Sequence, residues 1–559
     1  MRVPSSRYLA LAALSGALLV LSFPLPRLTL LAWFALVPLL IAASQESPRR
    51  AFVLGWIAGV VYFTGTLHWL TNTMVNYGHL PPWLSYPILL LLTLYLGLYV
   101  GGFAWAARTL ADQPAWRQLV ALPAIWTALE FARGHLLTGF PWAALGYSQA
   151  AVLPLIQIAD LTGVAGVSYV LVFTNVALAQ AVAAVWPRAH MSIPLPVASI
   201  VPPPASPASR SPIVPLAAAV LVLNGILAYG HRQLEVFRRD DAAAERVTVA
   251  VVQGNIDQDQ KWDPAHLRDT TERYQALTRE QTAHRPDLVV WPEAAMPFFF
   301  EREDVYRGEL VAFVEREGVP LLFGSPALEM SSENTPRLYN SAYLLSSDGR
   351  AAGRYDKLHL VPFGEYVPLS SLLFFVDKLV DGIGEFVPGE RATVFDLERF
   401  KLGVMICFEV VFPDLPRRAV LNGATVMAAI TNDAWFGPSA APYQHIEMVV
   451  FRAVENRVPF ARAANTGVSG FIDATGRLFN TTDLFVPATR AATLAPRTRT
   501  SFYTRYGDLF AWLCAAAGLL AVGRAAWTRG RPAAGPPGGI ERRRHARMPP
   551  VDPPRKEPS

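Results

Sequence analysis

Apolar stretches long enough to cross a bilayer constrain the fold of this chain more than any other feature. Hydrophobic residues make up 52% of the sequence and charged residues only 17%, which is too apolar for an ordinary soluble protein. The stretches cover residues 8–23, 28–43, 51–70, 83–107, 119–131, part of 152–186, 213–229 and 508–527. Since a span takes about 20 apolar residues, we expect about eight spans, about seven of them in a multi-span α-helical membrane domain at residues 1–232.

Arginines near the ends of these stretches predict which loops face the cytoplasm. They recur at the amino terminus and in every second loop, at Arg2, Arg7, Arg49, Arg50, Arg108, Arg117, Arg188 and Arg210. The alternate loops are poor in basic residues, and residues 71–82 have none. Because cationic loops resist translocation, we expect both termini in the cytoplasm, residues 233–505 outside, and a last span at 506–528. The first stretch lacks a small-residue cleavage site, so we interpret it as an uncleaved helix.

Two further segments are predicted to lie in the cytoplasm. Residues 187–212 are a Pro- and Ser-rich connector that is too polar to fold alone. Residues 529–559 are a basic, Pro- and Gly-rich tail, which we expect to be disordered and to contact anionic lipid headgroups. The net charge of +5 lies largely in this tail, so we expect no nucleic-acid partner.

From residue 246 the pattern changes to short β-rich runs that alternate with amphipathic helices. The predicted strands cover residues 246–253, 287–291, 319–324, 339–346, 402–407 and 426–431, and the predicted helices cover 263–284 and 443–457. This alternation indicates an α/β domain whose helices pack over the faces of sheets. We expect residues 233–505 to form that domain.

Three side chains that follow β-rich runs are candidates for catalysis. Glu293 lies in VVWPEAAMP, Lys357 in RYDKLHLVPFGEYVP and Cys407 in KLGVMICFEVVFPD. A carboxylate base, a cation and a thiol nucleophile at strand ends suit acyl transfer. Taken alone, they could equally be a surface carboxylate, a solvated charge and an inert buried thiol. Cys514 lies in the last span and cannot easily pair with Cys407, and an unpaired thiol on the oxidising side of a membrane favours catalysis.

Six strings in order carry a resemblance to a known family. They are QGNIDQDQKWD, WPEAAMP, YNSAYLL, YDKLHLVPFGEYVP, ICFEVVFPD and TNDAWFG. The domain resembles the nitrilase superfamily, whose members place a Glu, a Lys and a Cys at strand ends of an αββα sandwich. With its membrane half, the chain resembles the apolipoprotein N-acyltransferase branch over about 500 residues. No Cys or His cluster has metal-ligand spacing, so we expect neither a metal nor a cofactor.

The resemblance implies a role for each matched residue. It makes Glu293 the general base, Lys357 the oxyanion stabiliser and Cys407 the nucleophile. Further matched positions are the auxiliary glutamate Glu365 and the pocket residues Trp262, Asn340, Glu409, Trp435 and Phe436. Where the family often has a tyrosine after the cysteine, this chain has Phe408. Because a nearby ammonium and an acceptor carboxylate favour deprotonation of a thiol, we expect a raised thiolate fraction at Cys407.

The implied reaction is ping-pong acyl transfer at a bacterial inner membrane, with the catalytic domain on the periplasmic side. A phospholipid would acylate Cys407, and the α-amine of the diacylglyceryl-cysteine of an apolipoprotein would accept the chain. A thioester suits this second step because it accepts amines more readily than an ordinary ester does. One alternative is a membrane-tethered amidase that hydrolyses a carbon-nitrogen bond. Another is a transporter or lipoprotein-binding scaffold with an inert domain, against which the intact set of three residues argues.

Several other residues are open to two interpretations. The run 298–300 and the run 368–380 are either ordinary core or lids that dip into the bilayer. Glu130 and Asp160 lie beside apolar runs, and we favour span ends over a polar pathway. Glu409 could line the pocket or pair with an arginine. We expect His359 and His445 to be structural.

Overall fold

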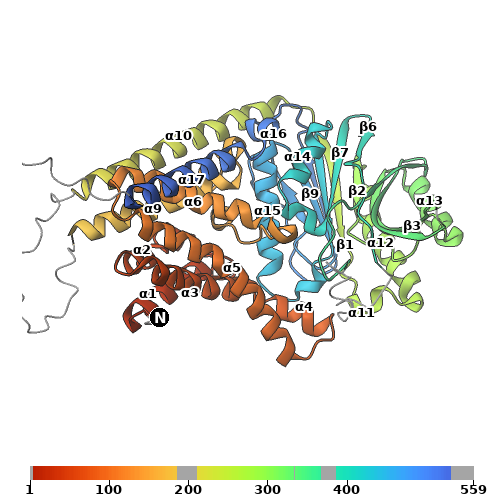
Figure 1. Cartoon of the computed structure of the whole chain (residues 1–559). Coiled ribbons are helices and arrows are strands. Elements are labelled where there is room, and N and C mark those ends of the chain that lie inside the picture. Colours follow the sequence, from red (N-terminus) through yellow and green to blue (C-terminus); the bar gives the residue numbers. More distant parts are fainter. Residues whose placement is uncertain (1–3, 186–210, 333, 367–384, 531–559) are drawn as a thin grey trace, which may run out of the picture.

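The computed structural model describes residues 4–185, 211–332, 334–366 and 385–530. The connector up to residue 210, the run 368–380 and the tail from residue 531 lie outside these residues. The chain has two parts, a bundle of helices and a sandwich of two sheets, which pack side by side (Figure 1). The expected fold class, a helical membrane domain beside an α/β sandwich, is therefore confirmed.

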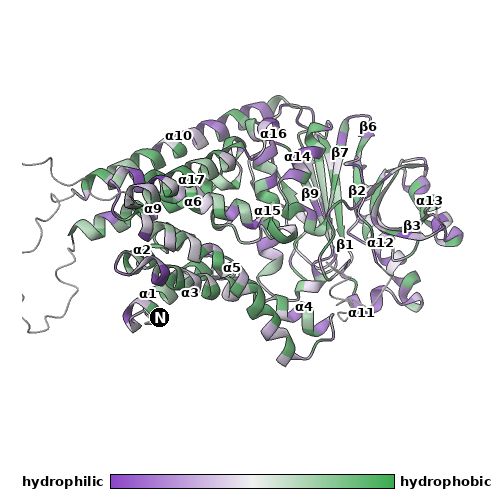
Figure 2. Ribbon diagram, viewed as in Figure 1, coloured by the Kyte–Doolittle hydropathy of each residue, from purple (hydrophilic) through white to green (hydrophobic). Residues whose placement is uncertain are grey.

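The bundle is built from helices that are apolar along most of their length (Figure 2). They are α1 (Ser6–Leu21), α2 (Val37–Ser44), α3 (Pro48–Leu67), α5 (Pro82–Leu110), α6 (Ala115–Arg133), α9 (Val164–Val185), α10 (Ile213–Ala243) and α17 (Leu509–Gly530). Helices α3 and α5 approach closely because small residues face each other: a Cβ on Gly55 would lie 2.4 Å from the carbonyl oxygen of Val100. Small residues at contacts of this kind are typical of helices packed within membranes.

By length and composition, five helices among the described residues can cross a membrane, namely α3, α5, α9, α10 and α17. The stretch at 28–43 divides into a 3-10 helix (Thr29–Trp33) and α2. The overlong stretch at 152–186 contains one long helix, α9, which is preceded by the short helices α7 (Leu153–Ile156) and α8 (Ala159–Thr162). Helix α8 ends at Gly163, whose φ is +64°. Glycine adopts this backbone conformation without steric cost, so the break falls there.

The sandwich consists of two six-stranded sheets with the strand orders β12-β1-β2-β3-β4-β5 and β11-β10-β9-β8-β7-β6. The strands of the first sheet are β1 (Val247–Gln253), β2 (Leu288–Val290), β3 (Leu321–Met330), β4 (Pro336–Leu345), β5 (Ala351–Asp356) and β12 (Ala488–Leu494). Those of the second are β6 (Val394–Leu397), β7 (Phe400–Ile406), β8 (Val426–Thr431), β9 (Phe460–Ala464), β10 (Gly470–Ile472) and β11 (Leu478–Phe479). Buried side chains such as Val251 and Ile430 fill the space between the sheets.

Helices cover the outer face of each sheet. On the first sheet, α12 (Leu267–Thr282) and α13 (Asp304–Glu317) bury Tyr274 and Phe313 against it, on the side away from the bundle (Figure 1). On the second sheet lie α14 (Asp414–Leu421) and α15 (Ala441–Asn456). Apolar side chains of α15 belong to the same buried cluster as the bundle. The sandwich is therefore joined to the bundle through α15, which has apolar neighbours on both sides.

Strand direction brings the candidate residues to one edge. Strands β1, β2 and β3 are parallel to one another, and so are β7, β8 and β9. The carboxyl ends of each set therefore lie at one edge of its sheet. On its other side, β3 pairs with β4 in the antiparallel direction. Glu293 follows β2, Lys357 follows β5 and Cys407 follows β7 directly. The predicted strands at 287–291 and 402–407 correspond to β2 and β7, whereas β5, β6 and β9 to β12 were not predicted.

Candidate active site

Two of the candidate residues lie at turns with an unusual backbone. Cys407 has a φ of +52°, and Ala294, directly after Glu293, has a φ of +46°. Residues other than glycine rarely adopt this region, and such positions concentrate at functional sites, where the surrounding structure must hold them. The turns point the Glu293 and Cys407 side chains away from the ordinary strand direction.

Lys357 joins two carboxylates at the centre of the site. Its Nζ donates to Glu365 Oε1 at 2.9 Å and lies 3.5 Å from Glu293 Oε1. Asn340 Nδ2 donates to the same two oxygens, each at 2.8 Å. Burial opposes the charge on Lys357, but Glu365 and Glu293 outweigh it and hold the pKa of Lys357 above its ordinary value. The side chain is therefore an ammonium throughout the neutral range.

Glu293 is held at both ends. Its Oε2 accepts the main-chain N–H of Asn432 at 2.9 Å, and its main-chain oxygen accepts a hydrogen bond from Lys261 Nζ at 3.0 Å. The side chain of Asn432 in turn donates to Gln258 at 2.6 Å. These bonds hold the Glu293 carboxylate in a fixed position.

Cys407 is a thiol in the resting site. Burial, and then the Glu293 charge, raise its pKa well above the ordinary value, and Lys357 offsets only part of that rise. The expectation of a raised thiolate fraction is therefore wrong, because burial outweighs the effect of the ammonium. The charges of Glu293 and Lys357 both act on the thiol, in opposite directions.

His445 contacts the main chain of Cys407. Its Nε2 lies 3.1 Å from the main-chain oxygen of Cys407, and its Nδ1 lies 3.1 Å from Asp433 Oδ1. Arg462 Nη2 donates to Asp433 Oδ2 at 2.7 Å, and all these side chains are fully buried. Burial, followed by Arg462, lowers the pKa of His445, so the ring is neutral and carries one proton. With that proton on Nε2, the ring donates to the Cys407 oxygen, and Nδ1 accepts from Arg462 Nη2 at 3.1 Å.

Glu409 is fully buried and binds donors on two segments. Its Oε1 accepts the Tyr355 hydroxyl at 2.8 Å and the main-chain N–H of Leu358 at 2.6 Å. Its Oε2 accepts the main-chain N–H of Ile406 at 2.7 Å. Glu409 thus ties the segment after Lys357 to the turn at Cys407. Burial raises its pKa to about 7.

The three aromatic candidates lie on the segments that follow Lys261 and Asn432. Trp262 follows α11 (Gln258–Lys261) and is 37% exposed. Trp435 and Phe436 lie on the segment after Asn432 and pack against helix α4 (Leu70–Asn76) and its flanks. Ring centroids are 5.1 Å apart for Trp435 and Tyr77 and 4.8 Å apart for Phe436 and Trp69. These contacts join the bundle to the loop that holds Glu293.

Sequence reasoning missed Lys261, Asn432 and the contact of His445 with Cys407. Lys261 and Asn432 lie inside the matched strings QGNIDQDQKWD and TNDAWFG, which were the only signal for them. His445 lies in the largely apolar helix α15, and the residues next to it in the sequence give no sign that it contacts Cys407. Of the residues with two interpretations, Phe298 and Phe300 belong to the buried core around α12 and α13.

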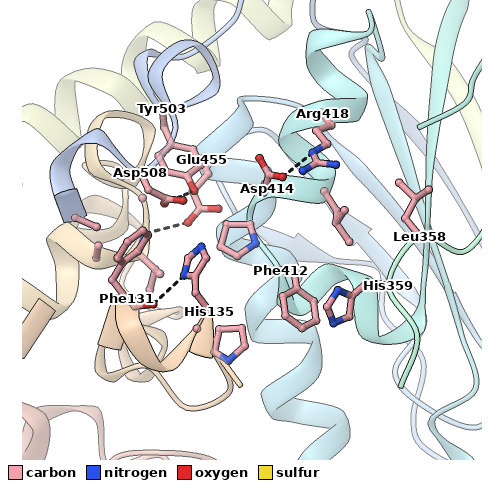
Figure 3. A pocket seen from close by; sticks show the side chains of 18 of the residues that line it. Phe131, His135, Leu358, His359, Phe412, Asp414, Arg418, Glu455, Tyr503 and Asp508 are labelled. Carbon is pink, nitrogen blue, oxygen red and sulfur yellow. Dashed lines mark hydrogen bonds and ion pairs between the residues drawn. The ribbon is translucent and has the colours of Figure 1, made fainter. Parts of the chain in front are cut away.

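A cavity of about 1080 Å³ lies between the bundle and the sandwich (Figure 3). Residues directly after Lys357 and the end of the Cys407 segment line one side, and the ends of α6 and the start of α17 line the other. The labelled lining residues are Phe131, His135, Leu358, His359, Phe412, Asp414, Arg418, Glu455, Tyr503 and Asp508. His359 stacks on Phe412 with ring centroids 3.8 Å apart. Burial, followed by Lys357, lowers the pKa of His359 to about 4, so its ring is neutral.

No cluster of His, Cys, Asp or Glu suited to a metal ion occurs in the described part of the chain. The chemistry that these residues can perform is nucleophilic attack by a thiol, with a fixed carboxylate as base and an ammonium beside the developing oxyanion.

Known proteins resemble this chain over nearly its whole length. The family described as Apolipoprotein N-acyltransferase N-terminal domain matches residues 15–177, and the family described as Carbon-nitrogen hydrolase matches residues 248–501. An apolipoprotein N-acyltransferase of Geobacter metallireducens is 44% identical over 515 residues, which are 92% of this chain and 94% of that protein. One of Allorhizobium ampelinum is 34% identical over 77% of each chain. A solved nitrilase-superfamily amidase of Nesterenkonia shows 19% identity, a TM-score of 0.35, and coverage of 44% of this chain and 90% of its own.

Proposed function

The chain belongs to the apolipoprotein N-acyltransferase family, and from this premise we propose that it moves an acyl chain from a membrane phospholipid to the α-amine of the diacylglyceryl-cysteine of an apolipoprotein, through a thioester on Cys407. The observation that carries the proposal is that Glu293 and Lys357, both buried after strands β2 and β5, act electrostatically on Cys407 after β7, while Glu365 is bonded to Lys357. An apolar helical bundle docked on the same sandwich gives lipid substrates a route to it.

In the first step, Glu293 takes the proton of the Cys407 thiol as Sγ bonds to the ester carbonyl carbon. The oxyanion forms beside the Lys357 ammonium. A single donor of this kind typically lowers the activation barrier by about 3 to 4 kcal/mol. The ester C–O bond then breaks, and Glu293 returns the proton to the glycerol oxygen. The products are a lysophospholipid and the Cys407 thioester.

In the second step, the α-amine attacks the thioester carbonyl. Glu293 accepts a proton from the nitrogen, the C–S bond breaks, and the sulfur is protonated again by Glu293. An amide is formed and the thiol is restored. The enzyme thus returns to its starting state, and each half-reaction uses the same base and the same cation.

The cavity between bundle and sandwich supports access from the bilayer. It lies where α6 ends and α17 begins, at the level where apolar helices meet the sandwich (Figure 2), and His359 and Phe412 on its wall adjoin the catalytic segments. We assign this level to the outer surface of the inner membrane, since the basic loops lie at the other ends of the spans. The catalytic part, residues 233–505, is then periplasmic.

Intact mass of the fragment that contains Cys407, after incubation of the full-length protein with phospholipid, tests the chemistry. We expect an added acyl group that disappears when a lipopeptide amine is supplied, and no adduct in Cys407→Ala. Cys514→Ala, with its thiol buried in α17, should form the adduct normally. Hydrolysis without an amine acceptor would favour an amidase, and no adduct with any donor would favour an inert scaffold.

Accessibility labelling of whole cells tests the orientation. Single cysteines introduced at the exposed position Arg350 in the sandwich and at the exposed position Arg49 in the first turn of α3 should react differently with a membrane-impermeant maleimide. We expect labelling at position 350 once the outer membrane is opened, and labelling at position 49 only after lysis. The reverse pattern would contradict the proposed topology.

A further inference from the structure

Lys261 is a buried lysine that the proposed reaction does not use. It ends α11, is only 2% exposed, and donates from Nζ to the main-chain oxygen of Glu293 at 3.0 Å. Within the described ranges it forms no ion pair with a carboxylate. Burying an ammonium without such a partner costs free energy. An uncharged side chain would fill this space at lower cost, so the charge itself calls for a function.

The charge of Lys261 acts on the catalytic groups. Burial lowers its pKa to about 8, and Glu293 and Cys407 oppose that shift when they are negative. These two titratable groups face the ammonium from neighbouring elements: Glu293 lies in the turn after β2, and Cys407 lies in the turn after β7. Lys261 is therefore charged at neutral pH and loses its proton in a range that an assay can reach.

A second cation is useful here because the site has more carboxylate than ammonium. Lys357 is shared between Glu365 at 2.9 Å and Glu293 at 3.5 Å. The Glu293 charge is also one of the causes that keep Cys407 protonated. The Lys261 ammonium, which is bonded to the main-chain oxygen of Glu293 and interacts with the charges of Glu293 and Cys407, offsets this negative charge while the thiol loses its proton.

Lys261 also fixes the turn that carries the base. Ala294 has a φ of +46°, which the surroundings must stabilise. Lys261 holds the carbonyl group on one side of the turn, and the main-chain N–H of Asn432 holds the carboxylate. Loss of either contact would let the carboxylate swing away from the sulfur.

We propose that Lys261 is a positioning residue for acylation, whose ammonium holds the Glu293 turn and supplies a second positive charge as the proton moves from Cys407 to Glu293. This role rests on the proposed acyl transfer. Lys261 keeps its own proton throughout: the S–H bond breaks, an O–H bond forms on Glu293, and the S–C bond forms to the acyl carbon. Glu293 then gives the proton to the leaving glycerol oxygen.

Single-turnover thioester formation tests this role, with full-length protein and a synthetic diacyl phosphatidylethanolamine in mixed micelles between pH 6.5 and 9.5. The wild-type rate should fall above about pH 8, as Lys261 loses its charge. Lys261→Met should be about 10 to 100 times slower at pH 7, since small misplacements of a catalytic group have effects of this size, and it should lack the alkaline fall. Lys401→Met, which changes an exposed strand lysine, should behave as the wild type.

The outcomes separate the possibilities. A wild-type rate and pH profile in Lys261→Met would overturn the role, and so would a slow variant that keeps the alkaline fall, because that pattern indicates a structural side chain alone. If Lys261→Met does not fold, Lys261→Arg decides: a guanidinium keeps its charge, so its rate should hold to pH 9.5, and a fall like that of the wild type would overturn the role. A wild-type protein that forms no thioester would instead contradict the proposed acyl transfer itself.

Discussion

Buried carboxyl groups surround the turn that carries Cys407, and they differ in what they bind. Glu293 and Glu365 share Lys357 and Asn340. Glu409 has no cationic partner among the described residues and accepts only hydroxyl and main-chain N–H groups. Residue identity alone does not separate a base from a clamp, whereas these contacts do.

Glu409→Gln should remove a pH dependence of stability. The pKa of Glu409 is raised from 4.5 to about 7, so the folded state binds this proton more tightly than the unfolded chain. Its contribution is full below pH 4.5 and is lost as the pH rises to 7, by about 3 kcal/mol from the size of the shift. Melting temperatures between pH 4.5 and 8 should therefore fall less in Glu409→Gln than in the wild type. Glu390→Gln, at an exposed position, is the control, and parallel curves for all three proteins would contradict the prediction.

Asn340→Asp should inactivate the site by charge. Asn340 Nδ2 donates to Glu293 and to Glu365 at 2.8 Å, and a carboxylate in its place would face both acids without a proton to share. We expect thioester formation to slow by about 100-fold or more, from one lost charge-assisted contact and added repulsion. Asn334→Asp, at an exposed position between β3 and β4, should leave the rate unchanged. Equal activity of the two variants would show that the Asn340 amide, which binds both Glu293 and Glu365, is not needed for the reaction.

At the scale of elements, helix α4 is hydrogen-bonded to the segment that follows β8. Thr73 Oγ1 donates to the main-chain oxygen of Trp435 at 2.8 Å, and Gly437 closes the segment with a φ of +59°. The same segment begins with Asn432, whose N–H binds Glu293. A short helix of the bundle is therefore connected, through this segment, to the carboxylate of Glu293.

Gly437→Ala should weaken this connection. A Cβ at this position would lie 2.6 Å from Asn72 Nδ2, and the backbone conformation is strained for any residue but glycine. We expect a loss of about 1 to 3 kcal/mol in stability and slower thioester formation, measured as melting temperature and single-turnover rate. Gly308→Ala, where an added Cβ meets nothing within 4 Å, is the control. A Gly437→Ala protein with the control's rate would show that α4 does not act on the base.

At the scale of the whole molecule, buried polar groups lock the sandwich to the bundle. Arg457, at the end of α15, binds Asp160 of α8 with Nη2 and Oδ2 2.7 Å apart, and Tyr229 of α10 donates to the same carboxylate at 2.9 Å. Trp142 Nε1 donates to Gln444 of α15 at 2.7 Å. Contacts of this kind require a single relative placement of the two parts.

Asp160→Asn should destabilise the assembled molecule. It leaves the buried Arg457 guanidinium without its anion, and breaking a buried pair in this way costs about 3 to 5 kcal/mol. We expect a clearly lower melting temperature in detergent and earlier release of the sandwich by limited proteolysis. Glu235→Gln, which removes an exposed carboxylate paired with Arg238 on α10, should have little effect. Equal melting temperatures would mean that the lock does not hold the two parts together.

The sequence by itself determined the two-part architecture, the α/β class of the second part and the segments that carry Glu293, Lys357 and Cys407, because span length, strand alternation and motif strings are properties of neighbouring residues. Only the tertiary structure decided that Lys261 and His445 reach the catalytic turns, that Glu409 is a clamp, that burial keeps Cys407 protonated, and that the stretch at 152–186 breaks at Gly163. Those features depend on contacts between residues far apart in the chain and on exclusion of water from a closed site, which no local pattern encodes.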